Sequence, residues 1–140
     1  EITPDMTLLK GRGYDLVREK LLARAADRFV VVADQSKLVN RIGEKFAIPI
    51  EVMPFAWQIV KHRLEAVGGK GALRQTANKD GLVMTSYGSL VLDVTFDPSI
   101  GHDTLDQVLN ATPGVIEHGI FRGLTSEALI VVDGKVEQRH

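Results

Sequence analysis

The chain contains no cysteine among its 140 residues, and this absence excludes a disulfide framework, a thiol nucleophile and a thiolate metal site. Histidine does not take over the role of metal ligand. The four histidines are scattered without the spacing that metal ligands require: His62, His102, His118 and His140. The sequence therefore predicts no metal site.

Long apolar runs, a secretory signal and an excess of basic residues are also missing. No apolar run approaches the length that crosses a bilayer, and no basic segment precedes an apolar run of the signal-peptide type. The formal net charge is -1, whereas nucleic-acid-binding domains usually carry a clear basic excess. Hydrophobic residues at 44% and charged residues at 25% are typical of a globular domain. We expect a cytoplasmic protein that binds a small molecule and neither nucleic acid nor membrane.

The first forty residues predict a strand, a glycine loop, a helix and a second strand. Residues 6–9 are short and apolar, and residues 29–33 form a β-branched run typical of a buried parallel strand. Between them, apolar residues recur at helical spacing at positions 14, 17, 21, 22, 25 and 26. This order is that of one right-handed crossover in a doubly wound parallel sheet.

The remaining residues follow a different pattern. Apolar and turn residues predict strands at 48–53, 72–76, 82–85, 90–94 and 115–121, and helices at 55–67 and 104–110. This order is ferredoxin-like, and residues 128–136 predict a hairpin around Asp133 and Gly134. We therefore predict an α/β fold in which part of a Rossmann-like doubly wound sheet is joined to a small ferredoxin-like α+β subdomain.

Basic residues follow both strands of the predicted crossover. Lys10 comes after the first strand with Gly11 and Gly13, and Lys37 comes after the second. Ligands of open parallel sheets bind outside the carboxyl ends of the strands, so both segments are expected at one edge. Glycines let the backbone approach a ligand, and the following helix offers free N–H groups to an anion. The pattern suits a small anion, although the same turn also occurs as a helix-entry loop without a ligand.

Two acidic residues have more than one interpretation. Glu19 lies at the margin of the predicted apolar stripe, where it is either a general base at the sheet edge or a solvated partner of Arg18 and Lys20. The spacing leaves both interpretations open. Asp93 interrupts an apolar strand and is expected to face outward.

Five motifs together resemble type A ribose-5-phosphate isomerases. Their order and spacing are those of this family: Lys-Gly-Arg-Gly at 10–13, Leu-Val-Arg-Glu-Lys at 16–20, Val-Ala-Asp-Gln-Ser-Lys at 32–37, Pro-Ile-Glu-Val-Met-Pro at 49–54 and Pro-Gly-Val-Ile-Glu at 113–117. The resemblance extends over almost the whole chain.

The resemblance implies an aldose-ketose isomerase that interconverts D-ribose 5-phosphate and D-ribulose 5-phosphate in the non-oxidative pentose phosphate pathway. Such enzymes use a cis-enediolate and neither a metal nor an organic cofactor. By position, Glu19 would move the proton and Lys10 would stabilise the enediolate charge. The loop formed by Lys10, Gly11, Arg12 and Gly13 would line the sugar, and Lys37 would hold the substrate near its phosphate.

The resemblance also implies a domain organisation and an assembly. Residues 1–46 would be the C-terminal part of a Rossmann-like catalytic domain, and residues 123–140 a returning strand or hairpin of that domain. Residues 47–122 would form the ferredoxin-like subdomain. In relatives this subdomain contributes to subunit contacts, so a homodimer or homotetramer is expected.

Two departures from the family pattern stand out. The loop often reads Lys-Gly-Gly-Gly, whereas this chain has Arg12 and then Tyr14. Family members also carry an upstream half with a Ser/Thr-Gly phosphate loop and an Asp-Gly-Ala-Asp segment, after which Glu1 would follow. We therefore expect a C-terminal portion of the enzyme that does not isomerise at a useful rate alone, because positioning and phosphate binding supply much of such catalysis.

Two further functions are compatible with the same pattern. One is a non-catalytic regulatory module that binds a sugar phosphate on this fold. The other is a purely structural assembly domain, which the set of Lys10, Glu19 and Lys37 disfavours.

Overall fold

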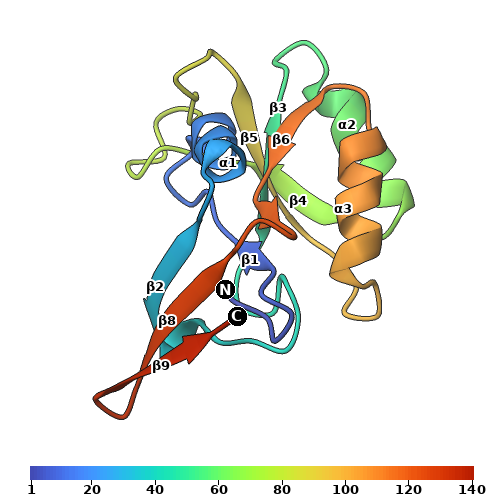
Figure 1. Ribbon diagram of the computed structural model, residues 1–140. Helices are drawn as coiled ribbons and strands as arrows, with labels where there is room; N and C mark the ends of the chain where they lie inside the picture. Colours follow the sequence, from blue (N-terminus) through green and yellow to red (C-terminus); the bar gives the residue numbers. More distant parts are fainter.

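A computed structural model describes all residues, 1–140, as nine strands, three α-helices and one short 3-10 helix in a mixed α/β arrangement (Figure 1). The strands are β1 Leu8–Leu9, β2 Val30–Asp34, β3 Ile48–Val52, β4 Lys70–Leu73, β5 Leu90–Thr95, β6 Val115–His118, β7 Ile120–Phe121, β8 Glu127–Val132 and β9 Lys135–Arg139. The helices are α1 Leu16–Ala25, η1 Gln35–Lys37, α2 Trp57–Ala66 and α3 His102–Ala111. None of the helices is both long and apolar enough to span a membrane.

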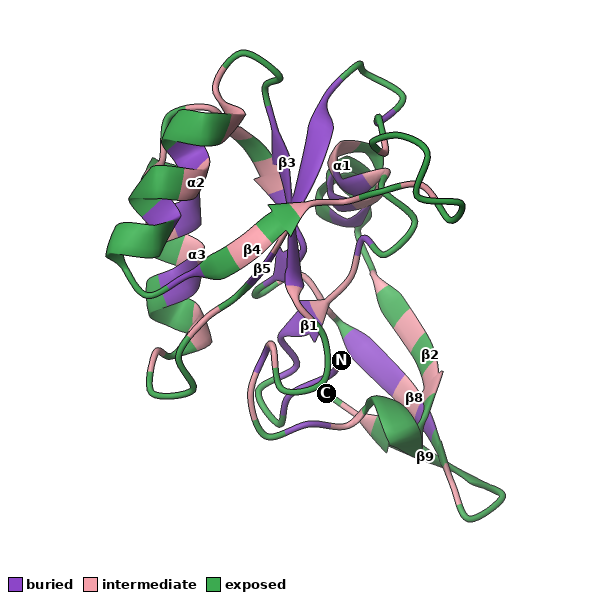
Figure 2. Cartoon of the chain, turned by 180° about the vertical axis from the view of Figure 1, so that it is seen from behind, coloured by how far each residue is buried: buried purple, intermediate pink, exposed green.

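The larger sheet has the strand order β4-β5-β3-β6, and all its neighbouring strands are antiparallel. Because side chains alternate along a strand, Ile48, Ile50 and Val52 point to the face that α2 and α3 cover. Residues from both helices complete this core: Val60, Leu64, Leu105 and Leu109. Figure 2 shows the buried positions concentrated along β3 and β5 and on the sides of the helices that face them.

The second sheet has the order β2-β8-β9, with β2 parallel to β8 as predicted. β2 is an edge strand whose residues are exposed or half-buried, so the prediction that it is buried is wrong. β8 and β9 form the predicted hairpin, and both turn residues have positive φ angles, 48° at Asp133 and 76° at Gly134. An Asp-Gly pair favours this turn because the backbone twist then matches that of the strands. The hairpin prediction is confirmed.

β1 does not pair with β2, contrary to the predicted crossover within one sheet. It pairs antiparallel with β7, with Leu8 opposite Phe121. The predicted strand at 115–121 is correspondingly divided at Gly119, whose N–H donates to the Pro49 carbonyl and whose carbonyl accepts from Lys10 N. The chain therefore leaves the larger sheet at Gly119 and joins β1.

The strand predicted at 82–85 is wrong. This segment contributes only isolated bridges, Gln75 with Leu82 and Met84 with Leu90. The Leu82 and Met84 side chains are exposed, so no apolar face holds the segment in a sheet. The strand predicted at 72–76 lies earlier, as β4 at Lys70–Leu73.

Helix α1 lies against β6, on the side of the larger sheet opposite α2 and α3 (Figure 1). Its buried residues are Leu16, Lys20 and Ala23, whereas Leu21 and Leu22 of the predicted stripe are 60% and 66% exposed. The predicted inward face is therefore wrong. Lys20 takes the inward position because its Nζ lies 2.5 Å from Glu117 Oε1 and 5.1 Å from the centre of the Phe121 ring.

His118, at the end of β6, is 1% exposed, and its Nε2 lies 3.2 Å from Asn110 Oδ1 on α3. Burial, together with the nearby cations Lys20 and Arg24, lowers the pKa of His118 from 6.5 to about 3. The unfolded chain therefore binds a proton that the folded chain excludes between these two pH values.

We expect this histidine to make the protein less stable as the pH falls from 6.5 towards 3. The free energy of unfolding should fall by up to roughly 1.4 kcal/mol per pH unit, since the unfolded state binds one more proton than the folded state in this range. Urea unfolding of the wild type and His118→Gln from pH 7 to pH 4 checks this, with exposed His62→Gln as the control. The stability advantage of the wild type over His118→Gln should shrink with falling pH, and parallel curves would contradict the prediction.

Candidate active site at the glycine loop

The glycine loop, residues 10–13, connects β1 to α1 in a conformation that requires Gly11. Gly11 has a φ of 90°, and a Cβ placed there would lie 1.5 Å from Leu16 Cδ2. The loop is held by backbone hydrogen bonds from Lys10 N to Gly119 O (2.9 Å) and from Tyr14 N to Gly11 O (3.1 Å). The Lys10 side chain thereby leaves the loop close to the first turn of α1.

Lys10 and Glu19 form an ion pair within this site. Lys10 Nζ lies 3.1 Å from Glu19 Oε2, and the two side chains are 38% and 30% exposed. Glu19 Oε2 itself is shielded from solvent and accepts no hydrogen bond, since the lysine approaches without hydrogen-bond geometry. Glu19 also lies in the first turn of α1, where the helix dipole favours a negative charge. The result is a carboxylate oxygen beside an ammonium group, with no hydrogen-bond donor of the protein aligned to it.

Lys37 reaches the same site from η1, which follows β2. Asp34 caps this short helix by accepting from Ser36 N at 2.7 Å, and hydrogen bonds from Ser36 lower the pKa of the Asp34 carboxyl. Lys45 Nζ donates to the carbonyls on either side of Lys37, those of Ser36 (2.6 Å) and Leu38 (3.1 Å). The backbone around Lys37 is therefore fixed, while its ammonium has no carboxylate partner.

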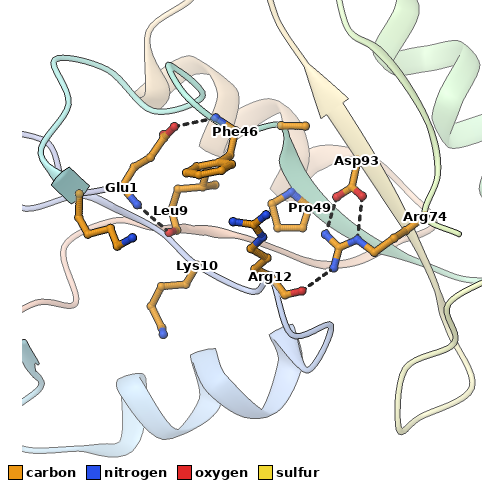
Figure 3. Close-up of a pocket in the computed structure, with 10 residues that line it drawn as sticks. Glu1, Leu9, Lys10, Arg12, Phe46, Pro49, Arg74 and Asp93 are labelled. Carbon is orange, nitrogen blue, oxygen red and sulfur yellow. Dashed lines mark hydrogen bonds and ion pairs between the residues drawn. The ribbon is translucent and has the colours of Figure 1, made fainter. Parts of the chain in front are cut away.

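Two adjoining hollows of about 610 and 440 Å³ meet at these residues. The larger is lined by all six residues that the sequence predicted for the site: Lys10, Gly11, Arg12, Gly13, Glu19 and Lys37. The smaller extends towards the larger sheet and is lined by Phe46, Pro49, Arg74 and Asp93 (Figure 3). Lys10, Arg12 and Lys37 line both hollows, and in the smaller one cationic side chains outnumber carboxylates, which suits a small anion.

Other residues of the cleft were not found from the sequence. Arg74 pairs with Asp93 and also donates from Nη1 to the Arg12 carbonyl at 2.9 Å (Figure 3). The Arg12 guanidinium lies 4.8 Å from the centre of the Phe46 ring. Asp93 faces away from the core under α2 and α3, as expected, and there it binds Arg74, which follows β4 and lies diagonally opposite. The sequence predicted this strand at 72–76, whereas β4 is Lys70–Leu73. The prediction therefore did not give the register that places Arg74 beside Asp93.

Glu1 is a further lining residue without a predicted role. Its carboxylate accepts hydrogen bonds from three backbone N–H groups of the loop that follows η1: Gly43 (2.7 Å), Lys45 (2.6 Å) and Phe46 (3.0 Å). These bonds fix the loop that carries Phe46. No group of three or more His, Asp or Glu side chains is arranged to hold a metal ion.

Residues 1–135 match the sequence model of a family described as ribose 5-phosphate isomerase A (phosphoriboisomerase A). The chain is 47% identical over 137 residues to ribose-5-phosphate isomerase A of Synechococcus sp. strain CC9605, covering 96% of this chain and 57% of the relative. It is 44% identical over 131 residues to the enzyme of the same name from Prochlorococcus marinus strain MIT 9211, covering 93% and 55%.

Solved structures of the same kind are similar throughout this chain. Ribose 5-phosphate isomerase A from Methanocaldococcus jannaschii superposes with a TM-score of 0.89 at 34% identity, covering 99% of this chain and 60% of the other. A D-ribose-5-phosphate isomerase in complex with phospho-erythronic acid gives 0.93 at 35% identity, covering 99% and 61%. The chain therefore spans somewhat more than half the length of the relatives it matches.

Gly11→Ala tests whether the loop depends on the unusual backbone at this position. We expect a loss of about 1–3 kcal/mol in unfolding free energy, because a methyl group would meet Leu16 and a positive φ is unfavourable for alanine. Gly13→Ala is the matched control, since its Cβ would meet nothing within 4 Å. Urea denaturation of both variants measures the difference, and equal losses would show that Leu16 is not the cause.

Proposed function

Because this chain belongs to the ribose 5-phosphate isomerase A family, we propose that it carries the proton-transfer part of an isomerase active site. The substrates are D-ribose 5-phosphate and D-ribulose 5-phosphate, interconverted through a cis-enediolate. The observation that carries this proposal is the Lys10–Glu19 pair, with its 3.1 Å separation, in a cleft that also contains Lys37 and the glycine loop.

In the proposed mechanism, Glu19 removes the proton from C2 of the open-chain aldose. The C2–H electron pair forms the C1–C2 double bond of the enediolate, and the C1 carbonyl oxygen takes the negative charge. The Lys10 ammonium lowers the energy of that charge. Glu19 then returns the proton to C1, while the hydroxyl proton of the C2 oxygen passes to the C1 oxygen and the C2 oxygen becomes the ketose carbonyl. No net redox change occurs, so the reaction needs no external electron acceptor.

The cationic residues of the cleft provide the proposed substrate contacts. Lys37, on its fixed backbone, holds the phosphate end, and the loop of Gly11, Arg12 and Gly13 lines the sugar. The N–H groups of Arg12 and Gly13 donate to no acceptor within the protein and both residues are exposed, so these groups are available to a ligand. The complex of one solved relative with phospho-erythronic acid supports a phosphorylated sugar derivative as the ligand class.

The proposed domain organisation follows the expected ranges. Residues 1–46 and 123–140 contribute to the catalytic domain, which the pairing of β2 with β8 supports. Residues 47–122 form the ferredoxin-like subdomain, which we propose contributes to a homodimer or homotetramer. A cytoplasmic location fits an enzyme of sugar phosphate metabolism. The regulatory and purely structural functions are not favoured, because the matched relatives carry the names of isomerases.

Glu19→Gln is expected to reduce kcat by about 10²–10⁴-fold, since general-base catalysis contributes that much, while the KM changes little. The assay follows ribulose 5-phosphate formation by the chain alone and by the chain joined to the parts of the Synechococcus relative that the match does not cover. Glu65→Gln is the matched control, because Glu65 also pairs with a lysine on a helix but lies outside the cleft. Near-normal turnover by Glu19→Gln would refute the role of this glutamate.

A further inference from the structure

The glycine loop has a single side-chain hydrogen bond, and its donor is Arg74, the residue that follows β4 of the larger sheet. Arg74 Nη1 donates to the Arg12 carbonyl at 2.9 Å, whereas the other bonds of the loop are between backbone groups. Gly11 and Gly13 flank Arg12, and a Cβ added at Gly13 would have no neighbour within 4 Å. Because glycine tolerates a wide range of φ, little else opposes rotation of the Arg12–Gly13 peptide.

Arg74 is itself held in one orientation. Its Nε donates to Asp93 Oδ2 at 2.7 Å and its Nη2 to Asp93 Oδ1 at 2.5 Å. Its backbone N–H donates to Val91 O at 2.8 Å, and its side chain is only 17% exposed. A guanidinium is planar and rigid, so two bonds to one carboxylate fix the direction of the third nitrogen. That nitrogen, Nη1, faces the loop.

The Arg12–Gly13 peptide is trans, as are all peptide bonds in the chain, so its C=O and N–H point in opposite directions. Arg74 and Asp93 line the smaller hollow, whereas Gly13 and Glu19 line the larger one. Holding the Arg12 carbonyl towards Arg74 thus directs the Gly13 N–H away from Arg74, and Gly13 lines the larger hollow together with Glu19.

We propose that Arg74, oriented by Asp93, is a positioning residue that fixes this peptide so that the Gly13 N–H donates to a substrate oxygen. The inference rests on the proposed isomerase function and assigns the larger sheet a part in it. A donor held in place before the reaction stabilises the enediolate charge without the cost of reorienting during catalysis. The small subdomain would thus act on the reaction through one guanidinium that does not touch the substrate.

The kinetic test compares Arg74→Met with Arg63→Met, an exposed arginine on α2 outside both hollows. Arg74→Met should lower kcat by roughly 10–100-fold with a KM within about threefold, as expected when a transition-state donor is misplaced. Added guanidinium should restore part of the activity of Arg74→Met, and Arg63→Met should match the wild type. Arg74→Lys, which can bind Asp93 but cannot form all three bonds, should be intermediate.

A second measurement does not depend on activity. In the chain labelled with ¹⁵N-glycine, the Gly13 amide resonance is identified by its loss in Gly13→Ala. It should shift or broaden in Arg74→Met and Arg74→Lys, and stay in place in Arg63→Met.

The two measurements separate the possible failures. An active wild type with an unaffected Arg74→Met variant would overturn the inference and leave the proposed function standing. An unchanged Gly13 resonance in both Arg74 variants would also overturn it. A wild-type chain that never isomerises the substrate, even when it is joined to the parts of the Synechococcus relative that the match does not cover, would refute the proposed function. The Gly13 resonance would still decide whether Arg74 fixes the peptide.

Discussion

The candidate site depends on a close approach of two backbone segments at Gly119. Both polar groups of this residue are used, its N–H by Pro49 and its carbonyl by Lys10. A Cβ at this position would lie 2.3 Å from the Lys10 carbonyl oxygen and 2.7 Å from Pro49 Cγ, so only glycine allows the approach. The larger sheet is thereby joined directly to the residue whose ammonium faces Glu19, and a shift in one must move the other.

Helix α1 is placed by a second interaction close to this junction. Burying Lys20 is unfavourable for its charge, and burial accordingly lowers its pKa, which Glu117 opposes as the ion-pair partner. Successive helical residues are separated by about 100°, so turning Lys20 towards β6 leaves Glu19 to one side of that contact, over the glycine loop. The ion pair that anchors the helix thus also determines which way the carboxylate faces.

Much of the site could be predicted from the sequence because its parts are local. Lys10, the two glycines and Glu19 lie within ten residues, and the strand that precedes Lys37 has an unmistakable β-branched run. Arg74 and Asp93 could not be found in this way, because their contact depends on how β4 and β5 align. Apolar periodicity failed for α1 because the buried face is formed by Leu16, Lys20 and Ala23, and a buried, paired lysine at its centre gives no apolar signal. The division at Gly119 depends on contacts with distant residues and leaves no local signal.

The parallel pairing of β2 with β8 has a consequence for the order of folding. Next to this pair, Phe29 N–H donates to Ser126 Oγ across 97 residues of sequence. Bringing such distant segments together carries a loop-closure cost that grows with the length of free chain between them. The antiparallel sheet formed by β3 to β6 lies within that interval, so its folding shortens the free chain and lowers the cost. The strand leading to Lys37 is therefore expected to dock late, so the cleft is completed only after the larger sheet has formed.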